Sequence, residues 1–233
     1  MRRSEVPVRR LVARWIPAAL ALALVLGPAA RSAAADAPVI AHVALGPGST
    51  LWLEGTSNVH DFESRTTELT LRLLRDPAAS DPADAAAFEQ WLVSGGSRGL
   101  ELGVPLAPMR SGKPGLDKNM LKALRAGEFP EITFRLTRSH VAETPGDTVG
   151  VTADGQLRVA GRERPITVTG RLVRSTAGVW LEGSHTLRMS EYDVKPPTMM
   201  LGTLRVHDPV VVHFRLLLTP GSPNGGVNAA SPH

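Results

Sequence analysis

The chain contains no cysteine, and only ten of its 233 residues are Phe, Trp or Tyr. The absence of cysteine excludes a disulfide framework, a thiolate nucleophile and a thiolate-bound metal. The scarcity of aromatic side chains argues against a site built as an aromatic cage. The apolar run IPAALALALVLG at residues 16–27 is shorter than the ~20 residues that a membrane-spanning helix requires.

The residues around this apolar run are typical of a secretory signal peptide. Five arginines precede the run, and Ala33–Ala35 follows it with the small residues that a signal peptidase needs. We therefore expect cleavage near Ala35, which makes residues 1–35 a signal peptide and the mature protein periplasmic or secreted. An uncleaved membrane anchor is the alternative, and the shortness of the run disfavours it.

The basic character of the whole chain comes from this first segment. Six of the 26 Lys and Arg, but only one of the 22 Asp and Glu, lie in residues 1–35, which leaves 20 basic and 21 acidic side chains in the mature chain. The sequence pI of about 10.1 therefore reflects the targeting segment. We expect no nucleic-acid partner, because a basic stripe interleaved with aromatic residues is missing.

Alternating apolar and polar residues dominate the mature sequence. The pattern occurs in residues 68–74, 131–137 and 165–173, and it is longest in residues 204–218. A period of two indicates strands with one buried and one solvated face, as in antiparallel sheets. We expect about eight or nine strands in one domain, residues 36–219, followed by a disordered Gly-, Pro- and Ser-rich tail at residues 220–233. Closure into a barrel or packing into a sandwich would protect the sheet edges.

Two stretches without this alternation are predicted to be helices. In the first, Asp81 is the expected N-cap, Pro82 the first helical residue and Gly95 the end. In the second, Asp117 is the expected cap and Gly127 the end. The second helix would place three apolar side chains on the face that packs against the sheet, namely Met120, Leu121 and Leu124.

Four motifs in a fixed order make the sequence similar to a known family. They are GTSNVHDFE at residues 55–63, MRSGKPGLDKNMLKALRAGEFPEITFRL at 109–136, GQLRVAGRERPITVTGRL at 155–172 and SEYDVKPPTMMLGTLRVHDPVVVHFRL at 190–216. Together they resemble the YceI-like family of secreted lipid-binding proteins. The resemblance implies an all-β fold: an extended, lipocalin-like antiparallel β-barrel of about eight strands with one or two short helices. Residues 76–98 depart from the family pattern, because this link is longer than usual.

The resemblance also implies a ligand: a long apolar chain such as a polyisoprenoid, a quinone tail or a fatty amphiphile, held inside the barrel. A barrel of about eight strands is just wide enough to fill itself or to hold one slender ligand. The alternation identifies inward-facing side chains, which either line a cavity or pack a solid core. The candidate lining residues are Leu53, Leu71, Phe134, Leu136, Val168, Leu181, Leu187, Val212 and Phe214.

A metal or hydrolytic site is the main alternative. Ser57, His60 and Asp61 include the residue types of a catalytic triad, but no GxSxG elbow accompanies them. No pair of histidines has a metal-binding spacing such as HExxH. The possible nitrogen and oxygen ligands are His60, Asp61, Glu63, His185, Asp193 and His207. A metal-dependent or hydrolytic enzyme would require His60, Asp61 and His185 to converge.

Two further sequence features concern the rim of the expected barrel. Lys195 begins the run Lys-Pro-Pro, and because proline cannot donate to a strand ladder, we expect an extended loop there. Lys195 and His60 are candidates for a polar rim that contacts a ligand head group. The segment WLEG occurs twice, at Trp52–Gly55 and Trp180–Gly183, and in each copy the Trp and Glu side chains should point away from the barrel interior.

The sequence therefore predicts an exported binding protein without catalysis, cofactor or metal. Its expected partner is a lipid-like small molecule, and no membrane span is expected in the mature protein. A ligand-free interaction module with a filled interior is the second alternative. The oligomeric state stays open, with a dimer possible.

Overall fold

The structure is a computed structural model, and it describes residues 39–41, 43–75, 80–81, 87–88, 90–91, 97–142, 148–199 and 204–221. All of these residues belong to one compact unit, Ala35–His233. The predicted signal peptide lies outside the described residues, and so does the predicted tail beyond its first two residues. Within the described part of the chain, no helix is long and apolar enough to cross a membrane.

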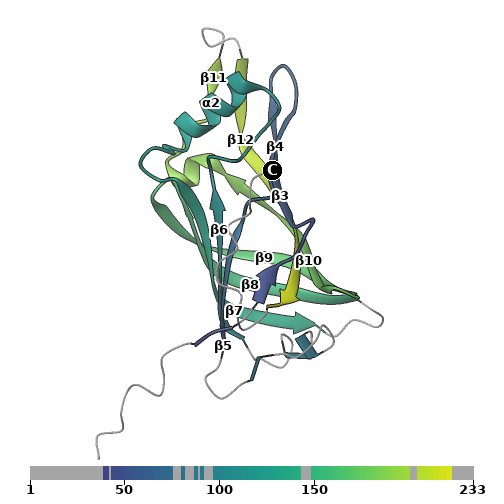
Figure 1. Ribbon diagram of the computed structural model, residues 1–233. Helices are drawn as coiled ribbons and strands as arrows, with labels where there is room; N and C mark the ends of the chain where they lie inside the picture. The colour runs from purple at the N-terminus through teal and green to yellow at the C-terminus, as the bar shows by residue number, and fades with distance from the viewer. Residues whose placement is uncertain are drawn as a thin grey trace, which may run out of the picture. The chain divides into compact units, whose positions relative to one another are not determined.

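The described part is an antiparallel β-protein in which one α-helix, α2, is described over its full length (Figure 1). A short 3₁₀ helix, η2 (Met189–Tyr192), follows strand β10 (Gly178–Arg188). The other elements in chain order are β1 (Val39–Ile40), β2 (Val43–Leu45), β3 (Thr50–Ser57), β4 (Phe62–Thr66), β5 (Thr70–Arg75), β6 (Ser97–Pro105), α2 (Pro114–Ala123), β7 (Glu131–Ala142), β8 (Thr148–Val159), β9 (Arg162–Ser175), β10 (Gly178–Arg188), β11 (Thr198–Met199) and β12 (Leu204–Pro220).

The twelve strands form one sheet in the order β1-β5-β6-β7-β8-β9-β10-β12-β3-β4, with β2 and β11 both pairing with β12. The first short strands join the two sides of the curled sheet, because β1 pairs with β5 whereas β2 pairs with β12. Elsewhere Arg65 of β4 forms an isolated bridge with Arg110, in the segment after β6. The sheet therefore curls into a barrel, which confirms the fold predicted from the sequence.

Burial alternates as predicted in β5 and along most of β9, whereas residues 216–218 near the end of β12 are all buried. Three strands have only two or three residues, and the other nine match the eight or nine expected. In β12, Asp208 stands at an otherwise apolar position, and there the pairing with β3 shifts register between Val206 and Val210. The Asp208 carboxylate leaves the apolar face and accepts hydrogen bonds from the backbone N–H and the hydroxyl of Ser190, at 2.8 and 2.7 Å. The bulge thus accommodates the one residue that breaks the alternation.

Helix α2 packs its apolar face against one end of the barrel. Met120, Leu121 and Leu124 contact a cluster formed by Leu51, Val104, Leu106 and Met109, as the sequence predicted. The expected cap was wrong, because the N-cap is Lys113 and the helix begins at Pro114. Asp117 instead lies in the first turn, where its carboxylate accepts hydrogen bonds from the backbone N–H and hydroxyl of Ser111. The helix ends at Ala123, before the predicted Gly127.

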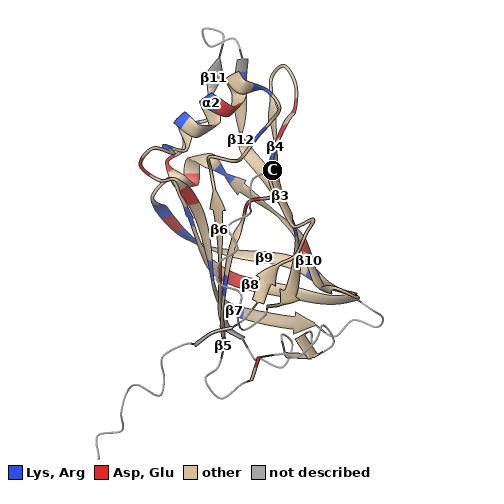
Figure 2. Cartoon of the chain, in the orientation of Figure 1, with Lys and Arg blue, Asp and Glu red and all other residues tan. Residues whose placement is uncertain are grey.

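Charged residues of both signs are interspersed over the outer strands and α2 in the view of Figure 2. Glu101, for example, lies between Arg72 and Arg135 of the neighbouring strands. This mixture agrees with the near-zero net charge counted for the mature chain. The apolar side chains therefore lie inside the barrel, which makes the interior the candidate location of a functional site.

Candidate functional site

The interior of the barrel holds an apolar cavity of about 280 Å³. For comparison, an engineered apolar cavity of about 150 Å³ stays dry and binds benzene. The lining of β12 runs from Val206 to Leu218, which corresponds to about 40 Å of strand at ~3.3 Å per residue. The cavity is therefore long and narrow, a shape that suits an extended chain better than a compact molecule.

Side chains from nearly every long strand and from α2 form the wall. Leu, Val, Ile, Met and Phe predominate, and four described lining residues carry polar side-chain atoms: Ser64, Ser139, His185 and Tyr192. The apolar lining residues are Leu51, Leu53, Phe62, Leu73, Leu100, Leu102, Val104, Met109, Leu116, Met120, Ala123, Leu124, Ile132, Phe134, Leu136, Val141, Val151, Ala153, Leu157, Val159, Ile166, Val168, Gly170, Leu172, Leu181, Leu187, Met189, Val194, Pro197, Val206, Val210, Val212, Phe214, Leu216 and Leu218.

Of the nine lining residues predicted from alternation, all except Leu71 lie in the cavity wall. Leu71 faces inward but packs against the cluster that includes Leu73 and Leu102, outside the lining. That position corrects its predicted place, because alternation identifies a face of a strand and not the depth of a cavity. The sequence reasoning missed the contributions of α2 and of the loop at Val194 and Pro197. The apolar face of α2 was the signal that could have indicated the first of these.

Ser64 and His185 lie on one register row of the barrel wall. Ser64 of β4 pairs with Leu53 of β3, Leu53 pairs with Val212 of β12, and Val212 pairs with His185 of β10. All four side chains line the cavity. Ser64 is 1% exposed, and its hydroxyl has no hydrogen-bond partner among the described residues. The row therefore places one polar side chain at each end, with Leu53 and Val212 between them.

Burial sets the ionisation of the two titratable lining residues. Desolvation lowers the pKa of His185 below its ordinary value of 6.5, against the opposing effects of the Glu191 carboxylate and a hydrogen bond with the backbone of Thr167. Burial also raises the pKa of the Tyr192 hydroxyl, and the nearby Glu191 adds to this shift while Arg164 opposes it. Both shifts favour the neutral form, so the wall presents dipoles to a ligand in place of charges.

His60 and Asp61 are exposed in the turn between β3 and β4. Ser57 holds this turn, because its hydroxyl donates to the carbonyl of His60 at 2.7 Å and accepts from the His60 N–H at 3.1 Å. The structure therefore uses Ser57 as a turn residue, and it places His185 in the cavity wall on another element. Among the described residues, no three His, Asp or Glu side chains gather in a way that could hold a metal ion.

The Lys-Pro-Pro run forms the expected extended loop beside the cavity. Strand β10 ends at Arg188, and η2 follows it. The side chains of Val194 and Pro197 line the cavity, whereas Lys195 between them is exposed. The backbone N–H of Val206 donates to the Pro197 carbonyl at 3.1 Å and holds the loop against β12. Lys195 thus lies beside the cavity, where contact with a head group stays a prediction.

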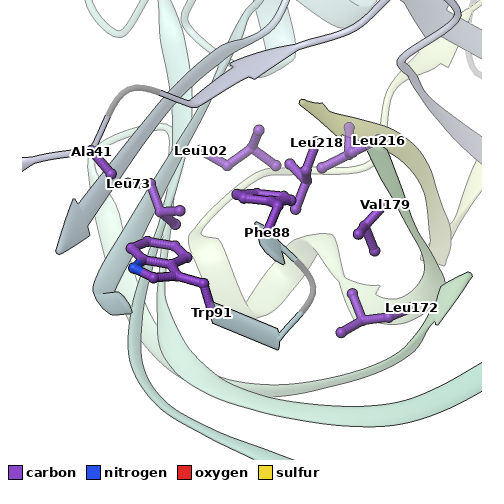
Figure 3. Packing of buried hydrophobic residues seen from close by; sticks show 9 residues of the cluster. All are labelled: Ala41, Leu73, Phe88, Trp91, Leu102, Leu172, Val179, Leu216 and Leu218. Carbon is purple, nitrogen blue, oxygen red and sulfur yellow. The ribbon is translucent and has the colours of Figure 1, made fainter. Parts of the chain in front are cut away.

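The opposite end of the interior is filled by two aromatic side chains from the link between β5 and β6. Phe88 is fully buried and Trp91 is 8% exposed, and their rings stack at a centroid distance of 6.0 Å. Figure 3 shows the Phe88 ring beside Leu218 and Leu102, with Trp91 beside Leu73. The sequence predicted a helix here, and residues 87–88 and 90–91 are helical, whereas Pro82 and Gly95 lie outside the described residues.

Comparisons with known proteins agree with this geometry. The family model described as the YceI-like domain matches residues 49–218. The crystal structure of BcnA from Burkholderia cenocepacia matches with a TM-score of 0.52 and 17% identity, over 73% of this chain and 95% of that one. A polyisoprenoid binding domain from Saccharophagus degradans, implicated in plant cell wall breakdown, matches with a TM-score of 0.55 and 13% identity, over 77% of this chain and 99% of that one. No curated protein sequence matches the chain.

Proposed function

Because this chain belongs to the YceI-like family, we propose that it is an exported, non-catalytic carrier that holds one long apolar chain inside its barrel. The observation that supports this most directly is the long cavity with its nearly continuous apolar wall. Burial of each methylene group contributes about 0.8 kcal/mol. A ligand with many methylene or isoprene carbons is therefore the class that such a wall favours, although ordering the flexible chain offsets much of the gain.

Three ligand types have this character: a polyisoprenoid, a quinone with its tail, and a fatty amphiphile. The polyisoprenoid binding named for the Saccharophagus degradans domain supports the first of them. Export is supported by the signal-like residues 1–35, which precede the residues matched by the family model. A periplasmic or secreted carrier of a water-insoluble chain needs a shielded interior, because the ligand would otherwise aggregate or enter a membrane.

The two alternatives have less support from the described residues. An enzyme that uses His60, Asp61 and His185 would require them to converge, but the first two are exposed in a turn and the third lines the cavity. A ligand-free interaction module would require a filled interior, and the cavity argues against this requirement.

The carrier proposal is tested by native mass spectrometry of the protein purified from its own host, followed by solvent extraction. We expect one long apolar molecule per protein chain. A stripped sample should then take up a polyprenol, a long-chain quinone or a fatty alcohol offered as the probe. If nothing apolar is extracted and none of the three probes can be loaded, the proposal is wrong.

A matched pair of variants separates binding inside the barrel from adsorption on its surface. Ala153 of β8 lines the cavity, whereas Thr169 of the adjacent β9 is exposed on the outer face. Ala153→Phe adds a ring to the cavity and should weaken probe binding at least about tenfold, a loss of about 1.4 kcal/mol. Thr169→Phe adds the same ring outside and should bind like wild type. Equal binding by both variants would place the ligand elsewhere.

A further inference from the structure

Phe88 occupies the lumen of the barrel itself. Its fully buried side chain belongs to one cluster with residues from five strands of the wall, β5, β6, β9, β10 and β12. The cluster members in these strands are Leu73, Leu102, Leu172, Val179, Leu216 and Leu218. All of them except Val179 also line the cavity. The ring and the cavity therefore share the same wall, and the ring takes the space at one end of it.

The β5–β6 link that carries Phe88 is attached to the barrel at its start, and the side chains of Phe88 and Trp91 are buried. The ends of this segment are held together because Arg75 pairs with Ser97. Asp81 near the start of the segment forms an ion pair with Arg75 at 3.3 Å. The helical residues Ala87 and Gln90 are exposed while Phe88 and Trp91, three residues apart, are buried, as expected when one helix face points into an apolar space.

We propose that Phe88 is a specificity-determining residue that limits the length of the chain the barrel accepts. A chain that runs along the lumen away from the α2 end reaches the wall shared by Leu216 and Leu218, where the Phe88 ring stands in its path. A longer chain would have to displace the ring or leave its terminal carbons in water. This inference rests on the proposed carrier function. It adds to that function a selection for ligand length, made by a residue of the long β5–β6 link of this chain.

The experiment measures dissociation constants for a graded series of linear fatty alcohols, and separately of polyprenols, by native mass spectrometry on wild type and variants. Wild type should bind more tightly with each added carbon up to a limiting length and then show no further gain. Phe88→Ala should move this limit to longer chains. A chain two carbons beyond the wild-type limit should bind the variant at least about tenfold more tightly, since two more buried methylenes account for roughly this factor.

Phe129→Ala is the matched control. The Phe129 ring packs over Gly161 beneath the Arg125 guanidinium, whose central carbon is 4.6 Å from the ring centroid, and it is not among the lining residues. This variant loses the same atoms as Phe88→Ala and should keep the wild-type limit. If Phe88→Ala does not fold, Phe88→Leu keeps an apolar side chain at the position and should still lengthen the limit.

The outcomes distinguish the inference from the function on which it rests. If wild type binds none of the probes, both the carrier proposal and the proposed length limit are wrong. If wild type binds the series but the Phe88 variants that fold keep the wild-type limit, the carrier proposal stands and the role of Phe88 is wrong. A limit that lengthens equally in Phe129→Ala would also overturn that role.

Discussion

The indole ring of Trp52 stacks on the imidazole of His213, with ring centroids 4.9 Å apart and an interplanar angle of 7°. Glu54 contacts both rings: its Oε1 accepts a hydrogen bond from the Trp52 indole N–H at 3.2 Å, and its Oε2 lies 3.4 Å from Nε2 of His213. Trp52 and His213 are paired residues of β3 and β12. Trp52 and Glu54 of the first WLEG copy thus both contact His213 of β12 on the outer face of the barrel.

The second WLEG copy does the same from the other side of β12. The Arg215 guanidinium lies over the Trp180 ring, 4.2 Å from its centroid, and its Nε donates to Glu182 Oε1 at 2.9 Å. Strand β12 runs between β3 and β10. The repeat therefore places a Trp and a Glu on each flank of β12, where each pair holds a basic side chain of that strand.

Glu182 should make stability depend on pH in the acid range. Hydrogen bonds from Arg171, and then from Arg215, lower its pKa below the ordinary 4.5 despite partial burial. A lowered folded-state pKa means that the contribution is complete above the unfolded-state value and is lost as the pH falls through the folded-state pKa. Because both arginines are more than half exposed, we expect Glu182→Gln to cost about 1 kcal/mol at pH 7.

Urea unfolding of wild type and Glu182→Gln between pH 2 and pH 7 measures this contribution. The difference in the free energy of unfolding should shrink once the pH drops below 4.5. A difference that stays constant down to pH 2 would show that the carboxylate charge is not its source.

Alanine substitution of two buried serines should change the stability of the fold in opposite directions. Ser64 is buried without a hydrogen-bond partner among the described residues, whereas the Ser49 hydroxyl donates to the Gly46 carbonyl at 2.8 Å and accepts from the Leu217 N–H at 3.0 Å. An unsatisfied buried hydroxyl costs about 1–3 kcal/mol, and a satisfied one contributes about 1 kcal/mol. In ligand-free protein, Ser64→Ala should therefore stabilise by about 1 kcal/mol and Ser49→Ala should destabilise by a similar amount.

Chemical denaturation of the ligand-free protein checks both variants. Destabilisation by Ser64→Ala, equal to that of Ser49→Ala, would mean that the Ser64 hydroxyl is satisfied in solution.

His185 should make stability fall on mild acidification. Burial lowers its folded-state pKa below 6.5, so between the two values the unfolded chain binds more protons than the folded protein. Its contribution is then complete above pH 6.5 and is lost as the pH decreases toward the folded-state pKa. We expect His185→Gln to flatten the slope of the free energy of unfolding between pH 5 and pH 7. An unchanged slope in thermal or urea unfolding would contradict this assignment.

The inward and outward faces of the strands could be predicted from the sequence because alternation is a local property. Leu53 and Leu181 line the cavity while Trp52 and Trp180 lie outside, as the pattern indicated. The position of Phe88 could not be predicted in this way. Helix signals in the β5–β6 link show that a helix forms, but its packing partners lie on strands distant in the sequence. The position of Leu71 outside the cavity lining also depends on residues distant in the sequence, and so does the burial of the Ser64 hydroxyl.

The same limit applies to the pairing of phenylalanine with glycine across strands. Gly55 and Gly183 end the two WLEG segments, and the sequence alone names no packing partner for either of them. In the structure a Cβ added at Gly55 would lie 2.3 Å from the Phe62 ring, and one at Gly183 would lie 2.5 Å from the Phe214 ring. Each aromatic ring thus covers the backbone of a glycine in the adjacent strand, and only strand register reveals which glycine it covers.

Two glycine-to-alanine substitutions should therefore have opposite effects. At Gly183 the new methyl group would meet Phe214 and would also lie 2.5 Å from the carbonyl oxygen of Thr169, which belongs to the rigid sheet. Such overpacking costs about 1–3 kcal/mol. At Gly115, in the first turn of α2, no atom lies within 4 Å of the added methyl group apart from its chain neighbours and the backbone of its own helix. Alanine should therefore stabilise by up to about 0.5 kcal/mol because it restricts the unfolded chain.

Urea unfolding of the two variants tests this difference, and a double-mutant cycle with Phe214→Leu identifies the clash. Leucine removes the ring contact at Gly183 but leaves the Thr169 oxygen in place, so Gly183→Ala should cost less in the Phe214→Leu background and still remain destabilising. If Gly183→Ala costs the same in both backgrounds, the aromatic ring does not press on the glycine. The strand backbone alone would then account for the requirement for glycine at this position.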